Sequence, residues 1–328
     1  MKIVLWIVGA VVVVVGGAFA FLVLKKPAMS APSPVKVEIT AERLQRGKYI
    51  FETLGSCEDC HSQRDPARFS GPIVPGTTGR GFEWPAELGL PGKVVSPNIT
   101  PDAETGIGSW TDGEILRAIR EGVSKDGRAL FPFMPYQQFR SMSDEDAYSV
   151  VAYMRRMQPI KSKMSVTELD FPVKYMVKFA PEPVSGAVAA PAKGKTAEYG
   201  KYVATVGGCV ICHTKMDKGT PIEGMEYAGG EEFTIGSWFV RSANISPDAE
   251  TGIGKWSEDK FVAKFKGYAN LTFESAPRSV QANFTVMPWM AFSQIAEDDL
   301  RAIYAYLRTV KEVRHSVEVH PPVAPPRS

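Results

Sequence analysis

Apolar residues are concentrated at the N-terminal end of the chain, where residues 3–24 read IVLWIVGAVVVVVGGAFAFLVL without a charge. Lysines flank this run at position 2 and at positions 25 and 26. These 22 residues would form a helix about 33 Å long, enough to cross the hydrocarbon core of a bilayer. The alternative is a cleaved signal peptide ending near AMS at 28–30, although the apolar region of such peptides is normally about 7–15 residues long. The pattern predicts an anchor over residues 1–26, and lysines on both sides leave its orientation undecided.

Beyond this run, apolar positions at helical spacing predict short helices between loops rich in Gly and Pro. Thr111 and Glu114 form a capping box that opens a helix, and Gly122 is a natural stop. Ser143 precedes an acidic first turn, which suits a helix N-terminus. The predicted helices cover residues 42–54, 112–121, 144–157 and 258–266. The fold class is therefore mostly α, with long loops that need something to wrap around.

The same pattern occurs twice along the chain, in the same order and with an offset near 150 residues. The octapeptide PDAETGIG stands at residues 101–108 and again at 247–254. Around it, the paired segments are RGKYIFETLGSCEDCH (46–61) with YGKYVATVGGCVICH (199–213), FMPYQQF (133–139) with VMPWMAF (286–292), and EDAYSVVAYMRRM (145–157) with DDLRAIYAYLRTV (298–310). Such a repeat predicts two homologous domains.

The repeat sets the expected domain boundaries. The two domains cover residues 38–160 and 195–314, joined by residues 161–194 and followed by a Pro-rich tail over 315–328. Within the join, ELDFPVKYMVKF is apolar enough to pack on a domain, and PEPVSGAVAAPAKGK is typical of a linker. We expect the final HPPVAPPRS to be extended and mobile.

Composition and charge exclude one class of partner. The chain has 328 residues, which suits two domains of about 150 residues. Its 38 Lys and Arg nearly balance 36 Asp and Glu, giving a formal net charge of +2 without a dense basic run. A nucleic-acid partner therefore has no electrostatic basis.

All four cysteines fall in two C-x-x-C-H motifs, formed by Cys57, Cys60 and His61 and by Cys209, Cys212 and His213. This motif attaches c-type haem through two thiols on one turn, and the histidine binds the iron. Structural zinc would place the two Cys pairs about 15–20 residues apart, and a thioredoxin-like site would need a βαβ setting. Disulfides in an exported protein would not require a histidine after each pair. The motifs therefore predict two covalently bound haem c groups.

The repeat also selects a sixth iron ligand for each haem. Met134 and Met287 lie 73 and 74 residues after their histidines, and each precedes Pro and an aromatic residue. Proline stiffens the ligand loop, whereas a methionine taken alone would more often be a core residue. Met142 and Met290 are the nearest rivals. His/Met ligation raises the reduction potential relative to two histidines.

Haem-ligating histidines usually donate their other ring N–H to an acceptor that orients the ring. Pro72 and Pro221 follow the two histidines by 11 and 8 residues, and their carbonyl groups are the candidates. A turn proline without such a role is the alternative. His315 and His320 have no counterparts in the first repeat and are poor ligand candidates.

These residues carry a resemblance. A helix leading into C-x-x-C-H, a later M-P-aromatic and a closing helix with AYM or AYL resemble the class I cytochrome c fold, present twice. The blocks SPNITPD…TGIGxW resemble the cytochrome subunits of bacterial membrane-bound dehydrogenases for alcohols, gluconate and similar substrates. The resemblance covers residues 40–314. Those subunits commonly carry three haems and a C-terminal anchor, whereas this chain has two motifs and an N-terminal apolar run.

The resemblance implies that Asn98, Asn244, Trp110 and Trp256 lie against the haem edge near the propionates, and a simple packing loop is the alternative. Haem attachment of this kind implies export, so the haem domains would face the periplasm and the anchor would lie in the inner membrane.

Three functions are consistent with these features. The leading hypothesis is an electron-transfer protein that serves a dehydrogenase or respiratory complex and is not itself an enzyme. The alternatives are a dihaem peroxidase, or thiosulfate-oxidising cytochrome, and the dihaem subunit of a cbb3-like oxidase. A peroxidase needs a displaceable iron ligand. A cysteine-ligated thiosulfate enzyme needs a fifth cysteine, and this chain has four. The oxidase subunit lacks the NITPD…TGIG block.

Overall fold

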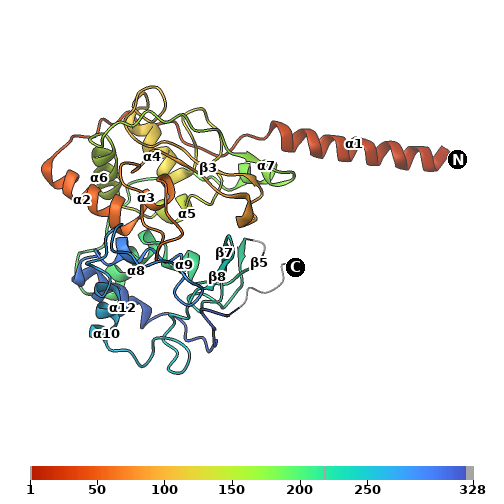
Figure 1. Ribbon diagram of the computed structural model, residues 1–328. Coiled ribbons are helices and arrows are strands. Elements are labelled where there is room, and N and C mark those ends of the chain that lie inside the picture. Colours follow the sequence, from red (N-terminus) through yellow and green to blue (C-terminus); the bar gives the residue numbers. More distant parts are fainter. Residues whose placement is uncertain (1, 218, 323–328) are drawn as a thin grey trace.

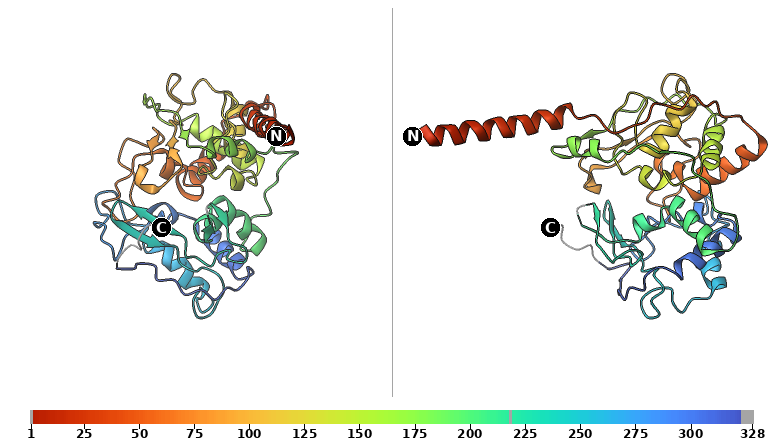
Figure 2. Two further views of the ribbon diagram at one scale, coloured as in Figure 1. Left: turned by 90° about the vertical axis from the view of Figure 1, so that its right-hand side faces the viewer. Right: turned by 180° about the vertical axis from the view of Figure 1, so that it is seen from behind.

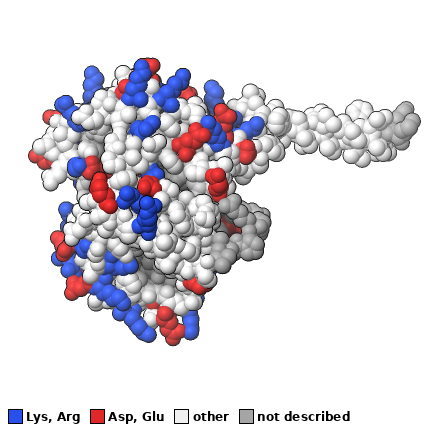
Figure 3. Space-filling view, viewed as in Figure 1, with Lys and Arg blue, Asp and Glu red and all other residues white. Residues whose placement is uncertain are grey.

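The computed structural model describes residues 2–217 and 219–322. It is mostly helical, with short antiparallel strand pairs. The first repeat and the second repeat form two halves that pack against each other, and α1 (Lys2–Leu24) projects from the first half as a separate rod (Figures 1 and 2). Figure 3 shows no Lys, Arg, Asp or Glu on the described part of this rod, residues 3–24.

The helices of the first half are, after α1, α2 (Ala41–Tyr49), the π-helical turn η1 (Ile50–Leu54), α3 (Cys57–His61), η2 (Ala86–Leu88), α4 (Asp112–Glu121), α5 (Tyr136–Phe139) and α6 (Asp144–Met154). The connection holds α7 (Val173–Met176) and η3 (Val177–Phe179). The second half has α8 (Ala197–Val206), α9 (Cys209–Cys212), α10 (Glu258–Lys266), α11 (Trp289–Phe292) and α12 (Glu297–Leu307). The predicted helices and the capping box of α4 are confirmed.

The strands form four two-stranded antiparallel pairs: β1 (Phe82–Glu83) with β3 (Val95–Ser96), β2 (Gly92–Lys93) with β4 (Glu168–Leu169), β5 (Met216–Asp217) with β6 (Thr220–Pro221), and β7 (Glu232–Ile235) with β8 (Trp238–Arg241). The β7–β8 hairpin was not predicted from the sequence. Gly236 turns it with a φ of 59°, a conformation that glycine adopts without a steric penalty.

Each half is built on one helix pair that crosses at a glycine. Helix α2 packs on α6, and α8 packs on α12. A Cβ placed on Gly47 would lie 1.9 Å from the carbonyl oxygen of Ser149, and one on Gly200 would lie 1.8 Å from that of Ala302. Only a residue without a side chain permits this approach of two backbones. The repeated GKY therefore marks two equivalent helix crossings.

The two repeats differ by one residue just after this crossing, and the structure shows how that residue is accommodated. Gly47 and Cys57 are ten positions apart, whereas Gly200 and Cys209 are nine apart. The extra residue widens the first helix into the π-helical turn η1, where Gly55 donates its N–H to the carbonyl of Ile50 at 2.7 Å. A π-turn inserts one residue without ending the helix. Both cysteine motifs therefore keep their place relative to the crossing.

Each half extends beyond the end of the sequence repeat. Ser162 donates its N–H to Thr105, and β4 pairs with β2, so residues 161–169 complete the first half. In the second half, His315 makes the equivalent bond to Thr251, and Gln281 donates to the carbonyl of Pro321. These contacts reach beyond residues 160 and 314, and the domain boundaries stay a prediction. The prediction for the rest of the tail, 323–328, lies outside the described residues.

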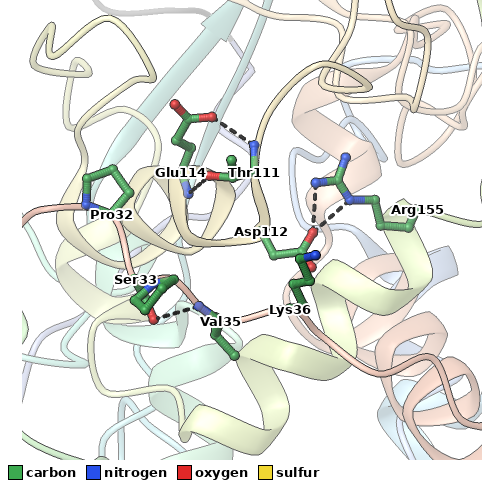
Figure 4. Close-up of a pocket in the computed structure, with 9 residues that line it drawn as sticks. Pro32, Ser33, Val35, Lys36, Thr111, Asp112, Glu114 and Arg155 are labelled. Carbon is green, nitrogen blue, oxygen red and sulfur yellow. Dashed lines mark hydrogen bonds and ion pairs between the residues drawn. The ribbon is translucent and has the colours of Figure 1, made fainter.

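Residues 30–37 run along α4 and tie α1 to the first half. Ser30 and Val37 donate their N–H groups to Glu121 and Asp112, at 3.0 and 2.8 Å. Arg155 holds the same Asp112 carboxylate at 2.7 Å (Figure 4). An open surface pocket lies beside this segment and is lined by Pro32, Ser33, Pro34, Val35, Lys36, Thr111, Asp112, Glu114 and Arg155. None of the predicted haem ligands lines it, so we assign it no role in the site.

The apolar piece of the connection does not pack on the first half as a whole. Val177 is buried, but Phe171, Met176 and Phe179 are exposed by 69%, 61% and 50%. The expectation that this piece packs on a domain is therefore only partly correct, because apolar composition does not specify which surface covers a side chain.

Substituting Gly200 by alanine tests the helix crossing. The added methyl group would overlap the Ala302 carbonyl and force α8 and α12 apart, so we expect the free energy of unfolding to fall by roughly 1–3 kcal/mol. Gly194→Ala is the control, because the nearest atom to its Cβ is 3.8 Å away. Denaturant unfolding of the two variants measures the difference. Equal stabilities would contradict the crossing.

Candidate functional site

The two cysteine motifs adopt the same short helical turn. In α3 the turn follows Ser56, and in α9 it follows Gly208, and both preceding residues have left-handed backbone angles (φ 44° and 65°). A single helical turn brings residues i and i+3 to one face, so the two thiols of each motif lie side by side. All four sulfurs are free thiols, which excludes the disulfide alternative in this structure. Burial raises the pKa of Cys57 and Cys209 to about 12, which keeps these thiols protonated.

A backbone carbonyl orients each motif histidine. The Nδ1 atom of His61 lies 2.8 Å from the carbonyl oxygen of Pro97, and that of His213 lies 2.7 Å from the carbonyl of Ala243. A carbonyl only accepts hydrogen bonds, so both rings carry their proton on Nδ1. The Nε2 atoms therefore keep a lone pair for a metal ion. Burial lowers the pKa of both histidines more than these hydrogen bonds raise it, so the rings are neutral.

The predicted acceptors, Pro72 and Pro221, are therefore wrong. The carbonyl of Pro72 instead accepts from the N–H of Asp65 at 3.0 Å, and Pro221 is an exposed residue of β6. Sequence proximity favoured a proline soon after each histidine, whereas the fold returns a residue 36 or 30 positions later. The signal in the sequence was the repeated block itself, because Pro97 and Ala243 immediately precede Asn98 and Asn244.

The two asparagines brace this returning loop. The Asn98 amide donates to Thr105 and to the carbonyl of Ile160, at 3.1 and 2.7 Å, while its oxygen accepts from Thr100. The Asn244 amide makes the equivalent bonds to Thr251 and Val313, at 3.1 and 2.8 Å. Both N–H groups of each amide are thus used within the protein. The packing role is evident, and contact with a haem propionate stays a prediction.

The repeated octapeptide forms the turn that these asparagines hold. The Asp102 carboxylate accepts from both the N–H and the hydroxyl of Thr105 at 2.7 Å, and Asp248 does the same for Thr251. A Cβ on Gly106 would lie 2.2 Å from the Thr100 carbonyl, so the close approach of the backbone requires a glycine here.

The two tryptophans that follow the octapeptides are partly buried and pack against the core. The carbonyl of Trp110 accepts from Arg155 at 2.5 Å, and that of Trp256 accepts from Tyr304 at 2.6 Å. Lys260 lies 4.6 Å above the Trp256 ring. These contacts fix the start of α4 and α10, and the predicted haem contact of both rings stays untested.

Met134 and Met287 occupy equivalent loops just before α5 and α11, and both are partly buried against the core. Of the two rivals, Met142 is 2% exposed within the core cluster, so its thioether is committed to packing. Met290 lies inside α11. The structure thus keeps Met134 and Met287 as the ligand candidates.

The loop of Met287 is held by the first half of the molecule. The Ser70 hydroxyl donates to the carbonyl of Met287 at 2.9 Å and accepts the N–H of Trp289 at 2.9 Å. Arg68 donates to the carbonyl of Phe273 at 2.9 Å, and Phe69 stacks on Tyr268, so the whole loop is docked across the two halves. Sequence comparison of the repeats missed Ser70, because the second repeat is six residues shorter between its motif histidine and the octapeptide.

The two motifs meet where the halves meet. Burial raises the pKa of Cys60, and Asp59 and Cys212 add smaller effects in the same direction. Gly207, just before the second motif, packs against Leu54, just before the first, because a Cβ there would lie 3.5 Å from the Leu54 side chain. The fold therefore brings together two sites that are about 150 residues apart in sequence.

A matched pair of tyrosines, Tyr202 buried and Tyr49 partly buried, joins the halves. Tyr49 donates to Asp299 at 2.7 Å, and Tyr202 donates to Asp146 at 2.5 Å. Each hydroxyl also accepts the backbone N–H that lies at the N-terminal end of the same helix, α12 or α6. The tyrosines occupy equivalent positions of the repeat, and so do the aspartates. The contact therefore runs both ways between the halves.

The donor set fits haem c better than a metal ion bound by protein alone. Among the described residues, no three His, Cys, Asp or Glu side chains are gathered as a metal site. Porphyrin supplies four nitrogen ligands to iron. One neutral imidazole with a free Nε2 and one thioether would therefore complete the coordination of the iron. Two adjacent protonated thiols beside each imidazole are what covalent attachment requires.

Comparison with known proteins agrees with this donor set. The chain is 30% identical over 286 residues to the cytochrome c subunit of the quinone alcohol dehydrogenase of Komagataeibacter europaeus, covering 82% of the chain and 56% of that protein. It is 28% identical over 287 residues to the gluconate 2-dehydrogenase cytochrome c subunit of Pantoea cypripedii, covering 81% and 59%. A diheme cytochrome c-type protein of Cereibacter sphaeroides is 25% identical over 310 residues, covering 93% and 97%. A comparison with protein-family models gives no match.

The homologues are cytochrome c subunits of dehydrogenases and a diheme cytochrome c-type protein. The chain is homologous to the cytochrome c subunits of alcohol and gluconate dehydrogenases and to a diheme cytochrome c, which confirms the resemblance inferred from the motifs. It spans little more than half the length of the alcohol and gluconate dehydrogenase subunits. The cytochrome c subunits among these relatives are electron-transfer components of dehydrogenases.

The pH dependence of stability tests the octapeptide turns. Hydrogen bonds from Thr105 and Thr251 lower the pKa of Asp102 and Asp248 below the ordinary value of 3.8. Their stabilisation is therefore present at neutral pH and is lost as the pH falls below 3.8 towards the folded-state pKa. The double variant Asp102→Asn/Asp248→Asn should have a lower melting temperature than the unmodified chain at pH 7. Its melting temperature should also fall less than that of the unmodified chain when the pH is lowered. Glu87→Gln, on an exposed turn, is the control, and an unchanged acid profile in the double variant would count against the turns.

Proposed function

We propose that this chain is a membrane-anchored dihaem c-type cytochrome, built from two tandem class I cytochrome c domains, that relays electrons between a dehydrogenase and a respiratory acceptor. The single observation that carries the proposal is the duplicated histidine geometry. Two neutral imidazoles, each held through Nδ1 by a loop carbonyl at 2.8 or 2.7 Å, stand beside paired thiols. Dehydrogenase subunits among the homologues support this role.

The chain's own residues would attach both haems and bind their iron. Cys57 and Cys60 would hold one haem covalently, and Cys209 and Cys212 the other. His61 and His213 would hold iron through Nε2, and Met134 and Met287 would each supply a second protein ligand. When bound, haem c supplies a one-electron ferric–ferrous couple. Thioether ligation by methionine favours the ferrous form and so raises the potential, and the fixed imidazoles limit movement between the two redox states.

The position of the two motifs supports a relay between the haems. Both motifs lie at the junction of the halves, and the tyrosine–aspartate contacts hold that junction. The residues that would hold the two haems therefore meet at this junction, where the bound groups would supply one-electron transfer between the halves. The chain itself would catalyse no reaction, and the substrate would be oxidised by the partner dehydrogenase.

Helix α1 would anchor the chain in the inner membrane with both haem domains in the periplasm. Among the described residues, one helix is long and apolar enough to span a membrane, Ile3–Leu24, with a mean hydropathy of 2.8. Haem attachment outside the cytoplasm supplies the orientation that the flanking lysines leave undecided. Purification of the tagged full-length chain from native membranes, followed by identification of bound proteins, tests the partner. A dehydrogenase subunit is expected, and isolation with oxidase subunits alone would contradict this part.

Haem content tests the cofactor assignment. Replacing Cys209 and Cys212 together by serine should lower the haem content from two per chain to one, because serine forms no thioether. The pyridine haemochrome spectrum relative to protein measures this ratio. The matched double variant at Cys57 and Cys60 should give the same loss. Two haems retained in either variant would refute the attachment sites.

Redox titration tests the methionine ligand and its support. Met287→Ala should lower the potential of one haem and remove one methionine–iron charge-transfer band, with both haems still attached. Ser70→Ala should weaken the same band and lower the same potential by a smaller amount, because it removes the hydroxyl that holds the Met287 loop. Ser165→Ala, an exposed hydroxyl near Glu83, is the control. If Ser70→Ala left both potentials unchanged, the loop would have no positioning role.

A further inference from the structure

An unassigned apolar surface lies beside the end of α1. We define the strap as residues 171–179, which contain α7 and η3, and it presents exposed side chains at Phe171, Met176 and Phe179. Figures 1 and 2 both place α7 next to the end of α1 nearest the first half. From this placement we propose that the strap is a second membrane-contacting element, seated in the interfacial region of an anionic bilayer.

The strap packs directly against the last turns of α1. The Tyr175 ring lies 5.9 Å from that of Phe19, and the Phe179 ring lies 6.3 Å from that of Phe21. Lys178 donates to the carbonyls of Leu22 and Val23, at 3.1 and 2.8 Å. The strap is therefore in contact with the proposed anchor itself, and not only with the segment that follows it.

The depth of these contacts fixes what surrounds the strap. Phe19 lies five residues before Leu24, the last residue of α1, so the contact is about 7.5 Å below the end of the helix. If α1 spans the bilayer, a segment packed beside Phe19 and Phe21 lies at the boundary between headgroups and acyl chains. Amphipathic elements at interfaces bury their apolar face about 5–10 Å into this boundary. The exposed side chains of the strap would then be covered by lipid.

Charge supports the same placement. Lys174 and Lys178 lie 5.2 and 5.4 Å from the Tyr175 ring, and Lys25 lies 5.5 Å from the Phe179 ring. Lysines beside aromatic rings suit a membrane interface, because the stem stays in the apolar layer while the ammonium group reaches lipid phosphates. Anionic headgroups would therefore bind more strongly than zwitterionic ones.

The strap is also tied to the haem-bearing body at both ends. Before it, β4 pairs with β2. After it, Arg140 donates to the carbonyl of Glu182 at 2.7 Å, and Val184 donates to Glu121 at 3.1 Å. A strap held in the interface would therefore restrict rotation of the first half about α1 and present a constant face to membrane partners.

Site-specific fluorescence tests the strap. The inference rests on the proposed anchor, so the experiment includes a reporter in α1. In the haem-loaded protein all four native cysteines would carry haem, so an added cysteine is the one reactive thiol. A nitrobenzoxadiazole label is placed in three single variants, Val12→Cys, Met176→Cys and Val280→Cys. Val280 is 54% exposed in the second half and serves as the matched control.

The full-length holoprotein is reconstituted in vesicles of phosphatidylcholine and phosphatidylglycerol that carry brominated acyl chains. We expect strong quenching at 12, quenching at 176 several-fold greater than at 280, and weaker quenching at 176 when phosphatidylglycerol is omitted. Quenching at 12 without quenching at 176 would overturn the strap and leave the anchor intact. A label at 12 that is not quenched would instead refute the anchor.

Native membranes distinguish lipid from a protein that covers the strap. If a partner subunit covers the strap, the label at 176 would be shielded from aqueous iodide in native membranes but not in vesicles that contain this chain alone. This outcome would also overturn the inference. Lys174→Gln/Lys178→Gln in the Met176→Cys background should remove the dependence of quenching on phosphatidylglycerol. Retained dependence would contradict the role of the two lysines.

Discussion

The site depends on one hydrogen bond in each half, from the Nδ1–H of a histidine to the carbonyl of a distant loop. The carbonyl of Pro97 is fixed because Asn98 clamps the loop to Thr105 and Ile160, and Asp102 closes the octapeptide turn around the same threonine. The second half repeats the arrangement around Ala243. The repeated residues are thus the support for an imidazole orientation. A carbonyl that moved away would release the ring and, with it, the Nε2 atom that the proposed function places on iron.

Much of this could be predicted from the sequence, and the reasons for the failures are physical. A local signal such as the capping box at Thr111 depends on neighbouring residues only, and the prediction made from it is confirmed. The acceptors of the two histidines depend on how a loop about 30 residues away returns, which spacing does not encode. Ser162 and His315 make their contacts through backbone N–H groups, which the identity of a side chain does not reveal. The apolar residues of the strap were expected to pack on a domain, but several are exposed. Hydropathy shows that a side chain is apolar and does not identify the surface that covers it.

The two halves share the same arrangement of site residues, but the structure around these residues differs. The π-helical turn after Gly47 absorbs one residue in the first half, and Ser70 supports the methionine loop of the second. Identical ligand sets can therefore sit in different mechanical settings. In the proposed relay, such differences would separate the two potentials, because loop stiffness decides how firmly a thioether stays on iron. The asymmetry lies outside the repeated motifs, which is why comparison of the repeats alone does not detect it.

The reciprocal tyrosine–aspartate contacts have a further consequence. Exchanging the two repeats maps the Tyr49–Asp299 bond onto the Tyr202–Asp146 bond, which is the defining property of an isologous interface between identical subunits. The polypeptide thus has the architecture of a homodimer whose protomers have been joined end to end. Joining makes the association concentration-independent. It also allows each protomer to diverge, since a serine at 143 and an alanine at 296 now occupy the same structural position.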